Sequence, residues 1–131
     1  MARIYGTAGN DIRNFSSETA GIEYFTRGGN DIVIGTSEGD IFHAEGGYRD
    51  NFRNIFFGGA GNDVFHGGEG RSTFVGGVGA DTFYGGYGVD TLSYEHSSAA
   101  ARVDLKNNPF SGGEAAVLSG VVPLTSADFI L

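Results

Sequence analysis

Aspartate residues recur at a fixed spacing in this 131-residue chain, and they are the side chains best suited to bind a metal. Asp63, Asp81 and Asp90 each occupy the sixth position of a nine-residue unit. Two glycines open each of these units, and a third glycine occupies the fourth position. Glycine lets backbone carbonyls crowd around a centre that a Cβ atom would block, and Ca²⁺ binds six to eight such carbonyl and carboxylate oxygens. The residue types and their spacing therefore favour calcium binding.

The units form an internal repeat. Weaker copies lie at 26–34 and 35–43, and an opening half-repeat lies at 6–11, with Arg13 where the apolar residue should be. Between 44 and 57 the frame slips by five residues, which predicts a bulged loop around Ala44 to Arg53. A sustained period of this kind indicates a solenoid. Four consecutive units have glycine at positions one, two and four and a large apolar residue at position eight: 58–66, 67–75, 76–84 and 85–93.

The pattern Gly-Gly-x-Gly-x-Asp-x-apolar-x resembles the nonapeptide repeats of the RTX (repeats-in-toxin) calcium-binding family. The resemblance is strong over 58–93, moderate over 26–43 and faint over 6–25. It implies an all-β fold, a right-handed parallel β-roll in which two nonapeptides make one turn and each supplies a calcium-binding turn and a short strand. We expect this β-roll over 1–93, with strict repeats at 58–93 and degenerate ones at 6–57. Residues 94–131 are expected to form a β cap.

If two nonapeptides make one turn, residues 18 apart lie on neighbouring parallel strands, about 4.8 Å from one another. This spacing is roughly twice the calcium–oxygen distance, so it suits a metal held between successive turns. Asp63 and Asp81 are 18 residues apart and predict the best site. Ser72 and Asp90 are also 18 apart, but the serine leaves one carboxylate and predicts a weaker site.

Further sites are expected in the degenerate repeats. Asp11 and Asp31 are 20 residues apart, which fits one turn with a two-residue bulge. Asp40 faces the slipped segment, where either Asn54 or Asp50 could complete its site. We expect two to four Ca²⁺ ions; the alternative is a metal-free solenoid with the same turns. The candidate ligands are Gly58, Ala60, Asn62, Asp63, Gly76, Gly77, Val78, Gly79, Ala80, Asp81, Gly85, Gly88, Asp90, Asp31, Asp11 and Asp40.

Composition excludes several functions. With 16 acidic and 8 basic residues, the net charge of −8 argues against nucleic acid and anionic membrane surfaces as partners. There is no cysteine for disulfides or thiol catalysis, and no apolar run approaches the roughly 18 residues of a membrane span. The histidines His43, His66 and His96 have no metal-ligand spacing, and no catalytic motif is present, so we expect no enzymatic activity.

The outward-facing residues and the C-terminal segment suggest possible contacts. Phe57, Val75, Ile55 and Val64 are expected to form an apolar outer stripe, which packs under a cap or contacts a partner. We expect a short strand at 101–105, a loop at 106–113 and further β structure at 114–124. The final residues resemble the uncleaved type I secretion signal of serralysin-type proteases and related lipases, although they could equally form a terminal strand of the cap: Asp128, Phe129, Ile130 and Leu131.

Stacked carboxylates about 5 Å apart repel by roughly 3 kcal/mol at an effective dielectric constant of 20, so folding is expected to require calcium. The main hypothesis is a non-enzymatic calcium-binding β-roll of an RTX protein, secreted by type I machinery and folding outside the cell. A second is an extracellular module that binds polysaccharide or a cell surface through Tyr84, Tyr87, Tyr94 and His66. A third is the detached C-terminal domain of a larger secreted protease, lipase or epimerase.

Overall fold

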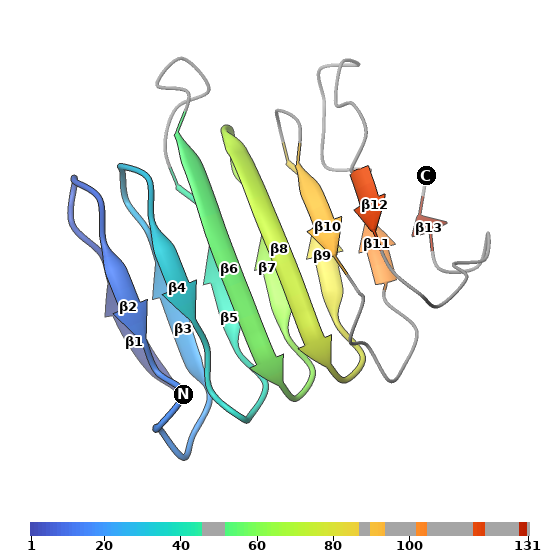
Figure 1. Ribbon diagram of the computed structural model, residues 1–131, viewed down its shortest axis with the longest axis horizontal. Coiled ribbons are helices and arrows are strands. Elements are labelled where there is room, and N and C mark those ends of the chain that lie inside the picture. The colour runs from blue at the N-terminus through green and yellow to red at the C-terminus, as the bar shows by residue number, and fades with distance from the viewer. Residues whose placement is uncertain (46–51, 87–89, 94–101, 105–116, 120–128, 131) are drawn as a thin grey trace.

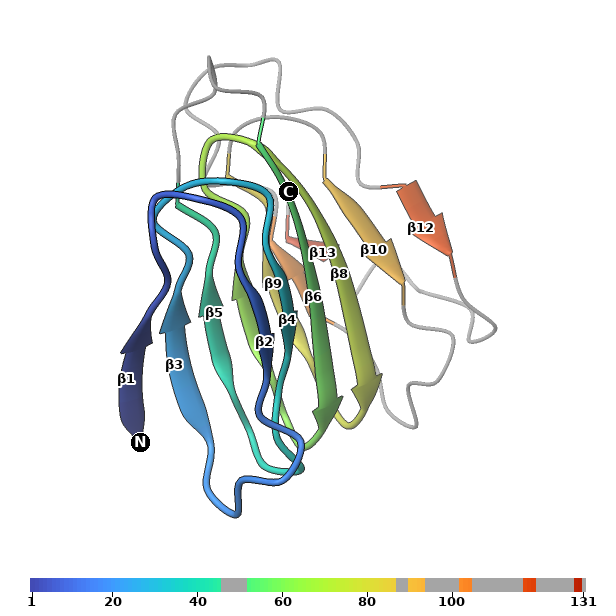
Figure 2. The same ribbon diagram turned by 60° about the vertical axis from the view of Figure 1, so that its left-hand side comes forward.

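The chain forms two parallel β-sheets that face each other (Figures 1 and 2). The computed structural model describes residues 1–45, 52–86, 90–93, 102–104, 117–119 and 129–130, and in these segments it contains thirteen strands and no helix. Successive strands alternate between the sheets, and all pairings are parallel. The predicted all-β parallel solenoid is therefore confirmed.

The odd-numbered strands form a seven-stranded sheet and the even-numbered strands a six-stranded sheet. The seven-stranded sheet contains β1 (Ala2–Tyr5), β3 (Ile22–Phe25), β5 (Ile41–His43), β7 (Val64–His66), β9 (Thr82–Tyr84), β11 (Arg102–Asp104) and β13 (Phe129–Ile130). The six-stranded sheet contains β2 (Ile12–Asn14), β4 (Ile32–Ile34), β6 (Arg53–Ala60), β8 (Arg71–Val78), β10 (Thr91–Ser93) and β12 (Val117–Ser119).

The pairing register follows the repeat. Val64 pairs with Thr82, 18 residues later, so two nonapeptides make one turn in the strict block. Ile12 pairs with Ile32, which confirms the two-residue bulge of the first turn. Ile41 pairs with Val64, because the five extra residues between β5 and β6 lengthen that turn to 23. Most of the bulged loop predicted around 44–53 lies outside the described residues.

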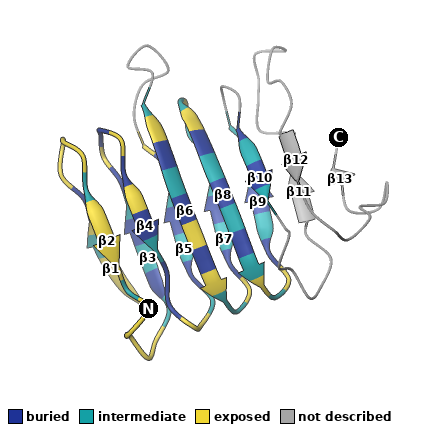
Figure 3. Ribbon diagram, in the orientation of Figure 1, coloured by how far each residue is buried: buried dark blue, intermediate teal, exposed yellow. Residues whose placement is uncertain are grey.

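The apolar residues at position eight form the core. Side chains alternate between the two faces of a strand, so position eight points between the sheets while positions seven and nine point outward. Buried residues accordingly alternate with less buried ones along the strands (Figure 3). Within the seven-stranded sheet the Phe65 ring stacks on Phe42 and Phe83, with centroids 5.0 Å apart in both pairs. Across the core the same ring tilts against Phe74 at 5.3 Å. The buried position-eight residues are Tyr24, Val33, Phe42, Phe56, Phe65, Phe74, Phe83 and Leu92.

The first turn departs from this pattern. Arg13 occupies position eight of β2, and all three residues of β2 are exposed, as the missing apolar residue indicates. Phe15 and Ile22 occupy the positions where later turns have glycine and aspartate, and the Phe15 ring lies 5.9 Å from that of Tyr24. One turn at the N-terminal end is therefore closed by apolar packing.

The predicted outer stripe was wrong in one residue. Ile55, Phe57 and Val75 share the outer side of the six-stranded sheet, but Val64 lies in the seven-stranded sheet. Because one nonapeptide is half a turn, position seven of successive units alternates between the two sheets. The stripe therefore divides between opposite faces of the roll.

The C-terminal strands continue both sheets. Strand β11 pairs with β9, and β12 pairs with β10, in agreement with the strands predicted at 101–105 and within 114–124. Phe129 and Ile130 form β13 and pair with β11, so the terminal segment contributes a strand to the roll. The predicted loop at 106–113 lies outside the described residues.

Two neighbouring phenylalanines test the assignment of the core. Phe56 is fully buried, whereas Phe57 is 39% exposed on the outer face. We expect Phe56→Ala to lower the free energy of unfolding by about 3–5 kcal/mol because it leaves a cavity, and Phe57→Ala to lower it by about 1 kcal/mol or less. Urea unfolding in saturating calcium, followed by circular dichroism, measures both losses. Equal losses would contradict the register.

Candidate metal centre

The glycine-rich turns form two columns at opposite ends of the strands (Figure 1). The lower column consists of the turns that lead into the odd-numbered strands, including 35–40, 58–63 and 76–81. The upper column consists of those that lead into the even-numbered strands, including 6–11 and 67–72. In both columns the residue at position six ends the turn, so these side chains stack from one turn to the next.

Three aspartates stack in the lower column. The backbone N–H of Asp63 donates to Asp81 Oδ1 at 3.0 Å, and the N–H of Asp40 donates to Asp63 Oδ1 at 2.8 Å. The column continues to Ile22, whose N–H donates to Asp40 Oδ1 at 2.8 Å. All three aspartates are buried. The predicted pairing of Asp63 with Asp81 is confirmed, and Asp63 has a second acidic neighbour.

The structure does not place Asn54, one of the two partners predicted for Asp40, beside it. Asp40 stacks on Asp63, and not on Asn54, which lies in the upper column and accepts the N–H of Asp31 at 2.9 Å. The five inserted residues belong to one upper turn, so the lower column runs past them without a gap. Asp50 lies outside the described residues.

The upper column also has three aspartates at position six, but they are not all consecutive. The N–H of Asp11 donates to Asp31 Oδ1 at 2.8 Å, and that of Ser72 to Asp90 Oδ1 at 2.8 Å, so both predicted neighbour pairs are confirmed. Asn54 pairs with Ser72 in the middle of the column, which therefore has two neutral residues in succession. Three aspartates are consecutive only in the lower column, because Asn54 and Ser72 separate Asp31 from Asp90 in the upper one.

The second oxygen of the carboxylate is hydrogen-bonded in some turns and unpaired in others, and Asp31 Oδ2 belongs with the unpaired ones. Asp63 Oδ2 is buried and has no hydrogen-bond partner. Asp40 Oδ2 instead accepts the N–H of Thr36 at 2.6 Å, and Asp11 Oδ2 that of Thr7 at 2.6 Å. Both threonines occupy position two, where the strict repeats have glycine, and each also donates its hydroxyl to the same aspartate. Sequence reasoning missed Thr7 and Thr36, although a threonine four residues before an aspartate is a recognisable signal.

A backbone carbonyl lies near the unpaired oxygen, and further carbonyls lie close to the glycines of the next turn. A Cβ atom at Gly58 would collide with Asp63 Oδ2 and lie 2.5 Å from the Gly76 carbonyl oxygen. Gly77 and Gly79 have φ angles of 97° and 139°, and a Cβ atom at either would collide with the carbonyl oxygen of Gly59 or Gly61 in the preceding turn. Only glycine permits this approach. The residues present thus fit a cation that accepts carbonyl and carboxylate oxygens together.

Most of the remaining predicted ligands lie in the lower turns 58–63 and 76–81. Asn62 Oδ1 accepts the N–H of Ala80 at 2.9 Å, which ties position five of one lower turn to the next, and the Val78 carbonyl accepts the N–H of Gly61. Ala60 ends β6, Gly85 follows β9, and Gly88 lies outside the described residues. Within the described segments no three Asp, Glu or His side chains form a metal-binding group by themselves. A cation in this column therefore needs the carbonyls.

Burial makes these carboxylates difficult to ionise without a cation. It raises the pKa of Asp63 to about 8, against the opposing hydrogen bond from Asp40 N–H and with a contribution from the charges of Asp81 and Asp40. Burial also raises the pKa of Asp90 to about 7 and that of Asp31 to about 6. The pKa of Asp81 is raised for the same reason. A buried carboxylate without a partner favours either a proton or a metal.

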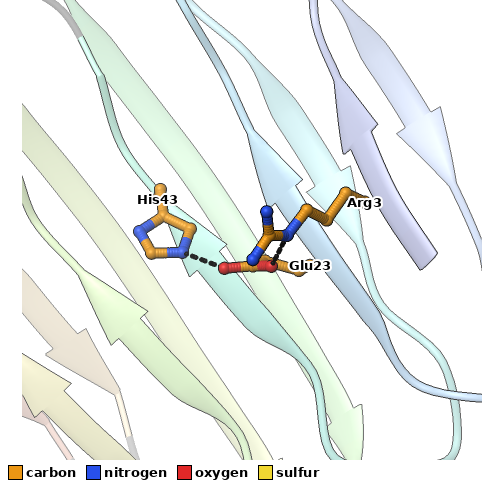
Figure 4. Close-up of polar contacts among 3 residues, drawn as sticks. All are labelled: Arg3, Glu23 and His43. Carbon is orange, nitrogen blue, oxygen red and sulfur yellow. Dashed lines mark hydrogen bonds and ion pairs between the residues drawn. The ribbon is translucent and has the colours of Figure 1, made fainter. Parts of the chain in front are cut away.

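The outer face of the seven-stranded sheet carries a different polar cluster. Glu23 accepts a hydrogen bond from Arg3 Nε at 2.8 Å and contacts His43 Nε2 at 3.0 Å (Figure 4). These contacts join β1, β3 and β5 on the outside of the roll. The His43 ring also stacks on His66 at 4.7 Å. Both histidines thus have structural contacts, and His96 lies outside the described residues.

The chain matches the family model of the RTX calcium-binding nonapeptide repeat, a model of four copies, over residues 25–47, 50–74 and 67–95. These segments together cover just over half of the chain. No curated protein and no solved structure gives a match. Among the described residues there is no helix with the length and apolar character needed to cross a membrane.

The raised pKa values predict an unusual pH dependence for the metal-free roll. Between about pH 8 and pH 4 the folded chain takes up protons at Asp63, Asp90 and Asp31 that the unfolded chain, with ordinary aspartate pKa values near 3.8, does not bind. The metal-free fold should therefore gain stability as the pH falls through this range. Calcium competes with the same protons for these carboxylates. The calcium concentration at the midpoint of folding should therefore rise as the pH falls. Circular dichroism in chelator and in calcium at several pH values measures both trends, and Asp63→Asn should weaken them. A metal-free roll that loses stability from pH 8 to pH 5 would contradict the assignment.

Proposed function

Because the chain belongs to the RTX calcium-binding nonapeptide repeat family, we propose that it is a non-enzymatic β-roll whose folding is driven by calcium bound between successive turns. One observation carries the proposal most directly. Asp63 Oδ2 is buried without a hydrogen-bond partner, beside Gly58 and near the Gly76 carbonyl oxygen. A buried anion of this kind is costly unless a cation compensates it.

The strict lower turns need this compensation more than the others. Asp63 lies between Asp40 and Asp81, so it borders two inter-turn spaces. Neighbouring charges about 5 Å apart repel by roughly 3 kcal/mol at an effective dielectric constant of 20. Ca²⁺, when bound, supplies the positive charge that removes this repulsion, and its binding free energy adds to that of folding. Two spaces in the lower column and those beside Asp31 and Asp90 support the expected two to four ions.

Charge substitutions test the shared role of Asp63. We expect Asp63→Asn to raise the calcium midpoint of folding roughly tenfold, and more than Asp81→Asn does, because Asp63 borders two spaces. Ser72→Asp should lower the midpoint by adding a carboxylate beside Asp90. Glu18→Gln, which removes an exposed charge outside position six, is the matched control and should leave the midpoint unchanged.

Calcium titration followed by circular dichroism gives the midpoints, and isothermal titration calorimetry gives the number of ions. The proposal fails if the wild-type spectrum is the same in calcium and in chelator and no heat of binding is measured. If Asp63→Asn and Glu18→Gln have the same midpoint, calcium does not use the lower column.

We further propose that folding takes place outside the cell, after export by type I machinery. Extracellular calcium is abundant enough for sites with dissociation constants of about 10⁻⁴–10⁻³ M. The resemblance of residues 128–131 to a type I signal supports the route, and strand β13 gives the same segment a place in the folded roll.

Deleting residues 128–131 should reduce secretion to background while the calcium midpoint changes little. The double variant Phe129→Thr with Ile130→Thr controls for the loss of strand β13. It keeps residues that favour strands but removes the apolar side chains proposed to act as the signal. Export of the deleted chain at the wild-type level, measured as the extracellular fraction, would exclude this role.

The hypothesis of a polysaccharide-binding module finds less support. Of its four residues, Tyr84 and His66 belong to a ladder of rings on the outer face, and Tyr87 and Tyr94 lie outside the described residues. Rings in this ladder stack face to face, with centroids 4.3–5.0 Å apart, so they cover the faces that a sugar would contact: Tyr5, Phe25, His43, His66 and Tyr84. Membership of a larger secreted protease, lipase or epimerase stays a prediction.

A further inference from the structure

A tyrosine hydroxyl is buried without a partner at the N-terminal end of the roll. Tyr24 occupies position eight of β3, where the next three strands of the same sheet with described side chains have phenylalanine: Phe42, Phe65 and Phe83. Its side chain is fully buried, and its Oη atom makes no hydrogen bond. A phenylalanine would fill the same space at no polar cost, so the hydroxyl calls for an explanation.

The hydroxyl points at the first upper turn. A Cβ atom at Gly6 would lie 2.8 Å from Tyr24 Oη, 2.9 Å from Asp11 Oδ2 and 2.6 Å from the Thr26 carbonyl oxygen. Three oxygens from three different residues therefore converge beside one glycine. Two hydrogen bonds from Thr7 hold Asp11 Oδ2 in this position.

A second turn shows what the hydroxyl replaces. A Cβ atom at Gly35 would meet the corresponding atoms, Asp40 Oδ2 and the Gly58 carbonyl oxygen, but its third neighbour is the ring carbon Cζ of Phe42 at 2.9 Å. Phe42 is the position-eight residue of that same unit. In the first unit position eight is Arg13, which is exposed. The space beside Gly6 that corresponds to the place of Phe42 beside Gly35 is filled by Tyr24, which comes from the opposite sheet.

Asp31 completes the surroundings. Its Oδ1 accepts the N–H of Asp11, and its Oδ2 is buried without a hydrogen bond, as the Tyr24 hydroxyl is. Burial first, and then the charges of Asp11 and Asp31, raise the pKa of Tyr24, while Arg13, whose side chain is close to the hydroxyl without forming a hydrogen bond of good geometry, lowers it. Tyr24 and Asp11 thus meet beside Gly6, Asp31 is bonded to Asp11, and two of the buried oxygens of these residues have no hydrogen-bond partner.

We propose that Tyr24 Oη, together with Asp11, Asp31 and the Thr26 carbonyl, forms a calcium site at the N-terminal end of the roll, in which the tyrosine hydroxyl is a ligand that the nonapeptide pattern does not contain. This inference rests on the proposed calcium function. The neutral hydroxyl adds an oxygen without adding charge, which suits a degenerate turn that has lost a position-two glycine.

Terbium luminescence tests the site directly in the full chain. Tb³⁺ substitutes for Ca²⁺ and emits when a nearby tyrosine is excited, and the chain has six tyrosines and no tryptophan. We expect Tyr24→Phe to remove at least a third of the calcium-displaceable emission. Tyr5→Phe, the same change on an exposed ring of the outer face, should leave it unchanged. Equal emission from the two variants would overturn the proposal.

Calorimetry and stability separate a ligand from a structural hydroxyl. Tyr24→Phe should weaken one class of calcium site roughly tenfold, Asp11→Asn should weaken the same class, and the double variant should add little to either change. In chelator Tyr24→Phe should fold at least as well as the wild type, because it removes an unpartnered hydroxyl. A Tyr24→Phe variant that is destabilised equally in chelator and in calcium would show a structural role and overturn the proposal.

The two proposals fail in different ways. If the wild-type chain shows neither calcium-dependent folding nor terbium emission, the calcium function itself is wrong. If the wild-type chain binds calcium and Tyr24→Phe binds it with the same stoichiometry and affinity, only the assignment of Tyr24 is wrong.

Discussion

A carboxylate at position six serves two purposes in this roll, and the rest of the structure depends on it. One oxygen of Asp40, Asp63 or Asp81 accepts a backbone N–H from the preceding turn, so the side chain belongs to the hydrogen bonding that holds successive turns together. The other oxygen faces the glycine cradle of its own turn. Folding therefore buries the charge that only a cation or a proton can compensate, which couples the stability of the roll to its ligand.

The two columns meet this constraint differently. In the degenerate turns Thr7 and Thr36 supply hydrogen bonds to their aspartates, and in the upper column Asn54 accepts the same N–H bond without a charge. The strict turns have glycine at position two and leave Asp63 Oδ2 unpaired. The departures at Thr7, Thr36 and Asn54 are thus not simple losses, because each one either adds a hydrogen bond to a carboxylate or removes a charge. At the N-terminal end Phe15 and Ile22 replace the glycine and the aspartate by apolar packing, so that lower turn has no carboxylate at position six.

The outer surfaces add stability without adding a ligand. On the seven-stranded sheet the stacked rings of position nine and the contacts of Glu23 with Arg3 and His43 join strands that are only three or four residues long. Cross-strand pairs of this kind each contribute a fraction of a kcal/mol to about 1 kcal/mol. The faces of these rings are covered by the neighbouring rings of the stack. The ladder therefore stabilises the sheet more than it offers a surface for recognition.

The sequence alone determined the repeat and its apolar position eight, and the resemblance to the RTX family implied two nonapeptides per turn. With that number, a strict period fixes which residues become neighbours, including Asp63 and Asp81. The sequence also showed that the frame slips by five residues, but not which aspartate lies across the insertion. The tertiary structure decided that Asp40 stacks on Asp63, since the extra residues all belong to one upper turn and the lower column passes them unbroken. It also placed Val64 on the sheet opposite Ile55 and directed the Tyr24 hydroxyl across the core to Gly6. Those outcomes depend on how side chains fill the space between the two sheets. The period of the repeat does not specify that packing.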